Sequence, residues 1–385
     1  MKRIGLSNPG IIFAFAMCFS LFLFIVAIMY TSGVTPFMDF IIKRTVKLHR
    51  VHNSTPVPLP ENTSSLDESL RYIPHSTIQT WKERDYLIVF GIPSVDIDGR
   101  RRRRYLQRTT CWQFPGVARR ANNFTGSMLV LYVLARQPFL SYRYSESLLK
   151  EVAEYHDVIT LSMNEGRVTT NKSIGDSGKW GLEAEVGLSR KVYFWLEMSL
   201  RLFPSVKYIA KGDDDMFLRV PQFLTDLRVL PVMNVYWGKF GKIHGFGGER
   251  TNGLFAGGPC YTLSRDVAWR IVSYTPIRDL LSVPFQKELE SQYISLDILS
   301  EDVMVGVVLR KSGYYRHVVF VFEKKCAFHD VHVGYPVEPV RDSSIMVHHL
   351  LESEYKLLMD RFGNDTGGVP RRRRYYKDRR IKFLC

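Results

Sequence analysis

The stretch KYIAKGDDDMFLRV, from Lys207 to Val220, combines two apolar runs with an acidic turn and indicates the kind of fold. Three consecutive aspartates, Asp213–Asp215, follow the β-like run Lys207–Ala210 and precede a second apolar run. Gly212 gives the backbone freedom at this turn. Because a hard divalent cation stabilises clustered carboxylates, the triplet predicts a Mg²⁺ or Mn²⁺ site. An acidic surface turn, or a helix cap at Asp213, is the alternative.

Apolar runs of two kinds alternate around this stretch. YLIVFGIPS (86–94) and SMLVLYVLA (127–135) have the length of buried strands, whereas SLLKEVAEY (147–155) and SRKVYFWLEMSLRLFP (189–204) have helical spacing. This alternation predicts an α/β domain with a largely parallel sheet. In open α/β sheets, ligands bind beyond the carboxyl ends of strands, which is where the aspartates are expected.

The N-terminal segment is typical of a membrane anchor. Residues 11–30 form an uncharged apolar run whose helix would be ~30 Å long, longer than the apolar core of a cleaved signal peptide. Basic residues on both sides leave the positive-inside count undecided. Five glycosylation sequons favour a cytoplasmic N-terminus and a lumenal body. The sequons are at Asn53, Asn62, Asn123, Asn171 and Asn364.

The expected organisation is a cytoplasmic tail (1–10), a transmembrane signal-anchor (11–30), a lumenal stem rich in Pro, Ser and Asn (31–80), a globular body (81–370) and a basic C-terminal tail (371–385). The formal net charge is +15, with basic runs at 100–104 and 371–382. Such runs bind phosphates or anionic lipid, or are simply solvated. For 371–382 we expect a solvated or membrane-facing tail, because blocks of like charge usually stay unfolded.

The cysteines outside the anchor would lie in an oxidising lumen, where three pairings of the four are open. They are Cys111, Cys260, Cys326 and Cys385. The sequence contains no CxxC pair, so a thiolate zinc cage is not expected.

Three later segments carry further candidate site residues. The segment NGLFAGGPCYTLS (252–264) contains Gly257 and Gly258, which let backbone approach a ligand or simply make a turn. The segment SEDVMVGVVLRKSG (300–313) begins with a serine and two acids that either cap a helix or face a cleft. The segment IMVHHLLESEY (345–355) contains the adjacent histidines His348 and His349, which are packed residues or ligands.

Taken together, these segments resemble the β1,3-glycosyltransferase superfamily of Golgi galactosyl- and N-acetylglucosaminyltransferases. KVYFWLEMSLRLFP, KGDDDMFL, GGPCYTLS and EDVMVG appear in that family's order, over roughly residues 81–354. RYLQRTTCW (104–112) matches the family's arginine motif only loosely, and Cys260 follows the glycine pair instead of preceding it. The pattern is most similar to the divergent trypanosomatid branch.

The resemblance implies a GT-A fold for residues 81–370 and a type II, single-pass Golgi membrane protein with a lumenal catalytic domain. It implies transfer with inversion from UDP-galactose or UDP-N-acetylglucosamine to a glycan on a glycoprotein or glycolipid, with Mn²⁺ as cofactor. Neither the donor sugar nor the linkage follows from it.

The resemblance also implies roles for single residues. Asp215 would be the main metal ligand, with Asp213 reaching the ribose or the metal, Asp214 either of these, and His348 or His349 a further ligand. Asp302 would be the general base, with Glu301 as the fallback. Arg104 and Arg108 would contact the diphosphate, or be surface charge.

Other classes of protein remain as alternatives. An inactive lumenal sugar-binding protein would share the fold but lose the metal or base, whereas Asp213, Asp215 and Asp302 are all present. A metal-dependent phosphatase or nuclease is compatible with the aspartate triplet alone. Nucleic acid is not an expected partner, because neither a P-loop nor zinc-finger spacing occurs.

Overall fold

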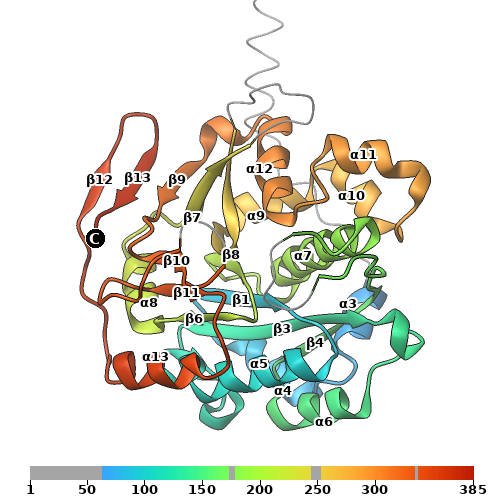
Figure 1. Ribbon diagram of the computed structural model, residues 1–385, viewed down its shortest axis with the longest axis horizontal. Coiled ribbons are helices and arrows are strands. Elements are labelled where there is room, and N and C mark those ends of the chain that lie inside the picture. Colours follow the sequence, from blue (N-terminus) through green and yellow to red (C-terminus); the bar gives the residue numbers. More distant parts are fainter. Residues whose placement is uncertain (1–62, 173–177, 244–252, 334–336) are drawn as a thin grey trace, which may run out of the picture. The chain divides into compact units, whose positions relative to one another are not determined.

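A computed structural model describes residues 63–172, 178–243, 253–333 and 337–385. The chain divides into two compact units, 1–61 and 62–385, and all described residues belong to the second (Figure 1). The expected anchor at 11–30, like Asn53 and Asn62, lies outside the described residues. Among the helices of the described unit, none is both long and apolar enough to cross a bilayer.

The described part of the chain forms a mixed α/β fold with a ten-stranded sheet, so the predicted α/β class is confirmed (Figure 1). The strand order is β12-β13-β9-β7-β8-β5-β1-β3-β2, with β4 also paired to β3. The strands are β1 (Ile88–Pro93), β2 (Val117–Ala118), β3 (Met128–Arg136), β4 (Val158–Asn164), β5 (Tyr208–Gly212), β7 (Val235–Lys242), β8 (Leu254–Ser264), β9 (Val319–Phe322), β12 (Arg373–Tyr375) and β13 (Arg380–Phe383).

Helices lie on both sides of the sheet, with α7 and α12 on one side and α5 and α6 on the other (Figure 1). The α-helices are α3 (Thr63–Leu70), α4 (His75–Glu83), α5 (Asp98–Thr109), α6 (Glu146–Tyr155), α7 (Leu182–Leu202), α8 (Val220–Arg228), α9 (Arg265–Val272), α10 (Thr275–Ser282), α11 (Glu290–Ser295), α12 (Glu301–Lys311) and α13 (Glu354–Phe362). Short 3₁₀ turns are η1 (Cys111–Gln113), η2 (Arg120–Asn122), η3 (Pro138–Leu140), η4 (Lys287–Leu289) and η5 (Tyr315–His317).

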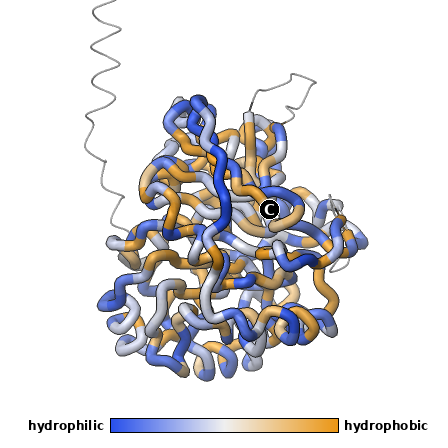
Figure 2. Tube along the Cα trace, turned by 90° about the vertical axis from the view of Figure 1, so that its left-hand side faces the viewer, coloured by the Kyte–Doolittle hydropathy of each residue, from blue (hydrophilic) through white to orange (hydrophobic). Residues whose placement is uncertain are grey.

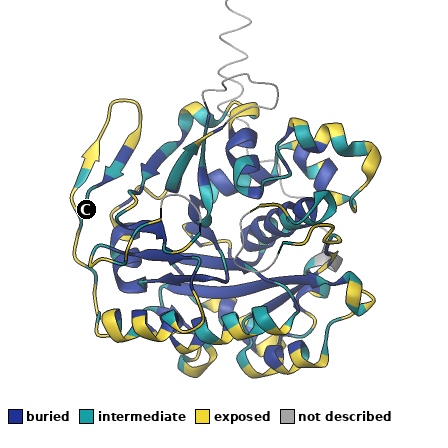
Figure 3. Cartoon of the chain, in the orientation of Figure 1, coloured by how far each residue is buried: buried dark blue, intermediate teal, exposed yellow. Residues whose placement is uncertain are grey.

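The parallel half of the sheet contains the strands predicted from apolar runs. β1 pairs in parallel with β3 and β5, and β3 pairs in parallel with β4, whereas β8 is antiparallel to β5 and β7. Figure 3 shows these central strands buried. Helix α7 approaches β1 closely because Gly91 has no side chain: a Cβ there would lie 2.1 Å from Trp195. The sheet is therefore parallel in its N-terminal half and mixed beyond β5.

A second sheet has three strands in the order β10-β11-β6, and β6 follows the aspartate turn that ends β5 (Figure 1). It consists of β6 (Met216–Leu218), β10 (Phe328–Asp330) and β11 (Met346–His348). β11 pairs antiparallel to β6 with His348 opposite Met216, and in parallel with β10 with His348 opposite Asp330. This register brings residues far apart in sequence to the aspartate turn.

The body begins earlier than the boundary expected at residue 81. Helices α3 and α4 belong to the same compact unit, and Leu70, Ile73 and Trp81 are buried. The Thr160 hydroxyl in β4 lies 3.4 Å from the carbonyl of Ser69. Residues 63–80 are therefore part of the folded unit, because amphipathic helices bury their apolar faces against it.

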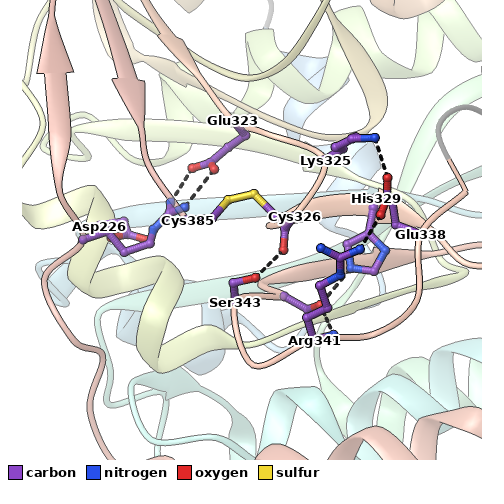
Figure 4. The surroundings of a disulfide bond; sticks show 11 residues. Asp226, Glu323, Lys325, Cys326, His329, Glu338, Arg341, Ser343 and Cys385 are labelled. Atoms are coloured by element: carbon purple, nitrogen blue, oxygen red, sulfur yellow. Dashed lines mark hydrogen bonds and ion pairs between the residues drawn. A yellow bond between two sulfur atoms is a disulfide. The ribbon is translucent and has the colours of Figure 1, made fainter.

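The basic C-terminal segment is not a free tail. β13 pairs in parallel with β9, and β12 completes a hairpin with β13 at the edge of the sheet. A disulfide between Cys326 and Cys385 attaches the chain end to the body (Figure 4). Cys111 and Cys260 are buried free thiols. The segment was predicted to be unfolded because its like charges repel one another. The burial of Phe383 and the disulfide outweigh this repulsion.

Candidate active site

The aspartate turn connects β5 to β6, and its backbone is fixed by side chains from two helices. Gln107 of α5 donates from Nε2 to the carbonyls of Asp213 (3.1 Å) and Met216 (2.9 Å). Tyr355 of α13 donates its hydroxyl to the carbonyl of Asp214 at 3.2 Å. The three carboxylates are therefore held in place before any ligand binds.

A candidate metal centre lies where this turn meets β11. One donor atom from each of Asp215, His348 and His349 lies within 4.8 Å of the others, and Asp215 and His348 are buried. His348 Nε2 is 3.0 Å from Asp215 Oδ1 and 3.5 Å from Asp213 Oδ2. Carboxylate and imidazole donors suit Mn²⁺ among other divalent ions, so the residues present fit a metal.

Charge compensation in this cluster is strong. Burial raises the pKa of Asp215, but the facing His348 imidazole and two arginines lower it well below its usual value. Burial lowers the pKa of His348, and the Asp215 carboxylate and its neighbours raise it well above its usual value. The side chain of Asp213 is 31% exposed, against 11% for Asp215, so Asp213 is the more accessible of the two carboxylates.

Asp330 orients both histidines, although no motif in the sequence distinguishes it. Its Oδ1 lies 2.6 Å from His348 Nδ1 and 2.9 Å from His349 Nδ1. A carboxylate on one imidazole nitrogen fixes the ring and leaves the other nitrogen free for a metal, as in carboxylate–histidine–metal triads. His349 follows β11 with φ +59°, a left-handed conformation that turns the chain at this point. The parallel register of β10 and β11, which places Asp330 opposite His348, is the feature that would have predicted this role.

Lys211 links the aspartate turn to the acidic start of α12. Its ammonium is 2.6 Å from Asp213 Oδ1, 2.6 Å from Glu301 Oε1 and 2.7 Å from the carbonyl of Gly258. Glu301 also accepts a hydrogen bond from the Tyr261 hydroxyl at 3.1 Å. Burial raises the pKa of Glu301 to about 7, and Lys211 opposes that rise. Both oxygens of Glu301 are therefore engaged in holding the site together.

Asp302 is less enclosed than Glu301 and accepts two backbone hydrogen bonds. Its Oδ2 accepts from Gly258 N at 3.0 Å and its Oδ1 from Val303 N at 2.9 Å. Burial raises its pKa above the usual value. The side chain is thus oriented at the N-terminus of α12 while remaining partly exposed.

The glycine pair has two different environments. A Cβ on Gly258 would lie 3.1 Å from Glu301 Oε1 and 3.4 Å from Lys211 Nζ, so this position is tight. A Cβ on Gly257 would meet nothing closer than 3.7 Å. Gly258 therefore lets strand β8 approach the acidic residues closely, whereas packing does not require Gly257.

The contacts of Arg104 and Arg108 correct their expected role at the diphosphate. Arg104 is fully buried and binds Glu151 through two nitrogens at 2.7 and 2.8 Å. Arg108 binds Glu151 at 2.7 Å and Asp157 at 2.7 and 2.8 Å. These ion pairs join α5 to α6 and to Asp157, in the connection between α6 and β4. Both guanidinium groups are therefore engaged in structural contacts.

The arginines that reach the acidic cluster are Arg100 and Arg103, which also belong to α5. Arg100 pairs with Asp214, and Arg103 Nη1 lies 3.0 Å from Asp215 Oδ2. Asp214 is 2% exposed and also accepts from the Ser94 hydroxyl at 2.6 Å. Burial and these bonds make Asp214 a structural member of the turn, while the two arginines place positive charge beside the candidate metal centre.

The described glycosylation sequons all lie on the surface. Asn123, Asn171 and Asn364 are exposed, and Asn123 has φ +50° in a turn. Their positions are compatible with an attached glycan.

The chain is 22% identical over 293 residues to the lactosylceramide 1,3-N-acetyl-beta-D-glucosaminyltransferase B of Xenopus laevis, which covers 70% of this chain and 67% of that protein. This similarity supports a relation to the glycosyltransferases. No protein-family model matches the chain.

Among solved structures, the apo form of mouse xyloside xylosyltransferase 1 aligns over 74% of this chain and all of that one, at 10% identity. The TM-score of 0.35 is too low to establish a shared fold.

Proposed function

We propose that the protein is a metal-dependent glycosyltransferase of GT-A type that transfers a hexose from a UDP-sugar to a glycan, with inversion. The observation that carries this proposal is the Lys211 bridge, because it joins the aspartate turn to Glu301 and thus to Asp302. A candidate metal centre and a candidate base then belong to one connected site. The glycosyltransferase relative supports the same class.

The residues around Asp215 would bind the donor. Asp215 and His348 would hold Mn²⁺, with His349 and Asp213 as further donors. The ion would offset the charge that develops on the departing diphosphate. Arg100 and Arg103 would contact phosphate oxygens, because guanidinium groups match them in two-point geometry. Asp213, the more exposed carboxylate, would reach the ribose.

Asp302 would act as the general base. Inversion by a single displacement requires a carboxylate within ~2.6–3.2 Å of the attacking sugar hydroxyl. A raised pKa makes Asp302 a better proton acceptor, and its two backbone hydrogen bonds orient it. Glu301 is less suited, since its oxygens are held by Lys211 and Tyr261.

The biological setting is part of the proposal. Residues 11–30 would anchor the protein in the Golgi membrane as a single-pass type II protein, with residues 62–385 in the lumen. The donor would be UDP-galactose or UDP-N-acetylglucosamine, and the acceptor a glycan on a glycoprotein or glycolipid. The Xenopus relative is named for N-acetylglucosamine transfer and for lactosylceramide, a glycolipid, which agrees with one of these options.

The proposal is tested by incubating the full chain with Mn²⁺, a panel of UDP-sugars and glycan acceptors, and measuring UDP release and product. We expect metal-dependent transfer that Asp215→Ala abolishes. A matched control is Asp67→Ala, which removes a surface carboxylate outside the site. Retained UDP-sugar binding without turnover on any acceptor would instead indicate a sugar-binding protein.

A further inference from the structure

The β12–β13 hairpin carries a concentration of positive charge that the proposed reaction does not use. Residues 371–382 contain eight basic residues and one acid. In Figure 2, where the side of the molecule with the hairpin faces the viewer, this segment is a hydrophilic stretch at the surface. Arg371 is committed to the interior: it binds Asp226 at 2.8 Å and Glu323 at 2.5 and 3.0 Å, two acids that Figure 4 labels beside the disulfide. Arg373 donates to the carbonyl of Val229, and Arg380 pairs with Asp378.

The strand register sorts the other side chains onto two faces. Ile381 and Phe383 are buried, so the residues that alternate with them point outward. The outward face therefore contains Arg374 and Lys382, which are directly opposite each other. Arg372, two residues before Arg374, continues this face. Among the described residues, no side-chain partner is found for any of these three cations.

Opposing like charges on neighbouring strands destabilise a sheet, so this face is unfavourable without an anion nearby. The turn of the hairpin adds two further cations, Lys377 and Arg379, and two exposed aromatic residues. Tyr375 is 63% and Tyr376 is 40% exposed. Exposed tyrosines between cations are typical of segments that rest in the headgroup region of a bilayer.

A cavity of about 420 Å³ continues the same face beside the disulfide. Lys382 lines it together with Lys324, Lys325 and Arg341. Two acids, Glu323 and Glu338, also line the cavity. Glu338 is paired with Lys325 and Arg341, at 2.7 and 2.9 Å, and Glu323 with Arg371. Among the described residues, Lys324 and Lys382 have no ion-pair partner, so they can bind an anion. Phe322 and Cys326 supply apolar wall. Cationic and apolar groups together suit a lipid headgroup.

We propose that the outward face of the β12–β13 hairpin, together with this cavity, docks the body on an anionic phospholipid surface. The disulfide and the Arg371 ion pairs hold the hairpin in one orientation, so the cations act as a fixed patch. Shielding an edge strand from aggregation is the other known use of such charge, and it requires no partner. The proposal depends neither on the sugar-transfer activity nor on the lumenal topology proposed above, because it requires only an anionic leaflet that faces the body.

The test is protection of the hairpin from trypsin, using the full chain with vesicles of phosphatidylcholine alone or with phosphatidylserine. Trypsin cleaves after Lys377 and Arg379, and the disulfide keeps the cut end attached until reduction, so release is measured by mass spectrometry after reduction. We expect protection only with phosphatidylserine, and loss of protection at high salt.

The variant Arg372→Gln/Arg374→Gln/Lys382→Gln should weaken this protection roughly 100-fold in lipid concentration, because each cation near an anionic membrane contributes about five-fold. The matched control removes three exposed lysines elsewhere: Lys82→Gln/Lys150→Gln/Lys287→Gln. Equal cleavage with both vesicle types would overturn the proposal. So would protection by a soluble sulfated polysaccharide but not by vesicles, or equal loss in the control variant.

Discussion

The ammonium of Lys211 lies 2.6 Å from Glu301 Oε1, so one buried ion pair joins the aspartate turn after β5 to the first residue of α12. Lys211 is 2% exposed and also touches Asp213 and the carbonyl of Gly258. Its pKa is raised: burial lowers it, but the two facing carboxylates more than offset this. The cation therefore stays charged at any physiological pH, and its removal deprives Asp213 and Glu301 of the cation that they share.

Lys211→Met is expected to lower the free energy of unfolding by about 3–5 kcal/mol at pH 8, because breaking a buried ion pair leaves uncompensated charge. Transfer activity should be lost as well, since α12 would no longer be held against the turn. Urea denaturation followed by circular dichroism measures the stability. Lys82→Met, at an exposed position, should change it by no more than about 0.5 kcal/mol. A variant as stable as the parent would show that the bridge is not a structural link.

Asp302→Asn should lower turnover by about 10²–10⁴-fold, the usual contribution of a general base, with little change in donor affinity. Asparagine keeps the size of the side chain, and its one oxygen can still accept one of the two backbone hydrogen bonds. Initial rates with saturating donor, together with calorimetric UDP affinity, separate the two effects. Turnover at the parent's rate would refute the assignment of Asp302 as the base. Glu301→Gln serves as the comparison, with a smaller effect expected.

Asp330→Asn should weaken Mn²⁺ binding by about 10–100-fold, because partners that orient a metal-ligating histidine typically contribute that much. The effect is measured on the metal itself, by titration calorimetry or by the electron paramagnetic resonance signal of free Mn²⁺. Asp226→Asn is the matched control. Asp226, like Asp330, is a buried carboxylate in an ion pair, but its partner is Arg371 and it lies away from the site. Unchanged Mn²⁺ affinity in Asp330→Asn would contradict the positioning role.

The sequence predicted those site residues whose position depends on the strand or helix next to them in sequence. The aspartates follow a strand, the acids begin a helix, and His348 and His349 lie near them as the resemblance implied. Asp330 was not predictable in the same way. It reaches His348 only through the register of two strands whose pairing residues lie 18 positions apart.

The arginine run shows a second limit. A stretch of five arginines, 100–104, has no apolar periodicity, so the sequence does not indicate which members face inward. The phase of α5 turns Arg104 towards Glu151 and Arg103 towards Asp215, although they are neighbours. The C-terminal run shows a third limit, because a disulfide and the Arg371 ion pairs order a segment whose charge alone predicts disorder.

Substitution of these neighbouring arginines should separate their roles. Arg104→Met removes one partner of a buried pair with Glu151 and should lower the free energy of unfolding by about 3–5 kcal/mol. Arg103→Met should leave stability closer to that of the parent and instead weaken UDP binding, since a charge-assisted pair to phosphate is lost. Thermal or urea unfolding and UDP calorimetry are measured on both variants. Weakened UDP binding in a fully stable Arg104→Met protein would restore the role predicted from sequence.

Glu301 should make stability depend on pH in a direction opposite to that of acids whose pKa is lowered by their partners, such as Asp215 and Asp330. Its folded-state pKa, about 7, exceeds the usual 4.5, so between these values the folded protein binds more protons than the unfolded chain. The stability that Glu301 contributes is therefore complete below pH 4.5 and is lost as the pH rises through 7. Glu301→Gln does not titrate. As the pH rises from 4.5 to 7, the unfolding free energy of the parent should therefore fall by roughly 3 kcal/mol relative to that of Glu301→Gln.

Measuring both proteins by urea denaturation in chelator cancels the contribution of the other acids, whose pKa values are largely shared by parent and variant. Asp330 and Asp215, with lowered pKa values, lose their stabilisation only at more acidic pH and should not affect the difference. A constant difference from pH 4.5 to 7 would mean that Glu301 stays ionised throughout. Lys211 would then hold Glu301 as a carboxylate at every pH tested. The attraction between the two charges would exceed the free energy needed to bury the carboxylate.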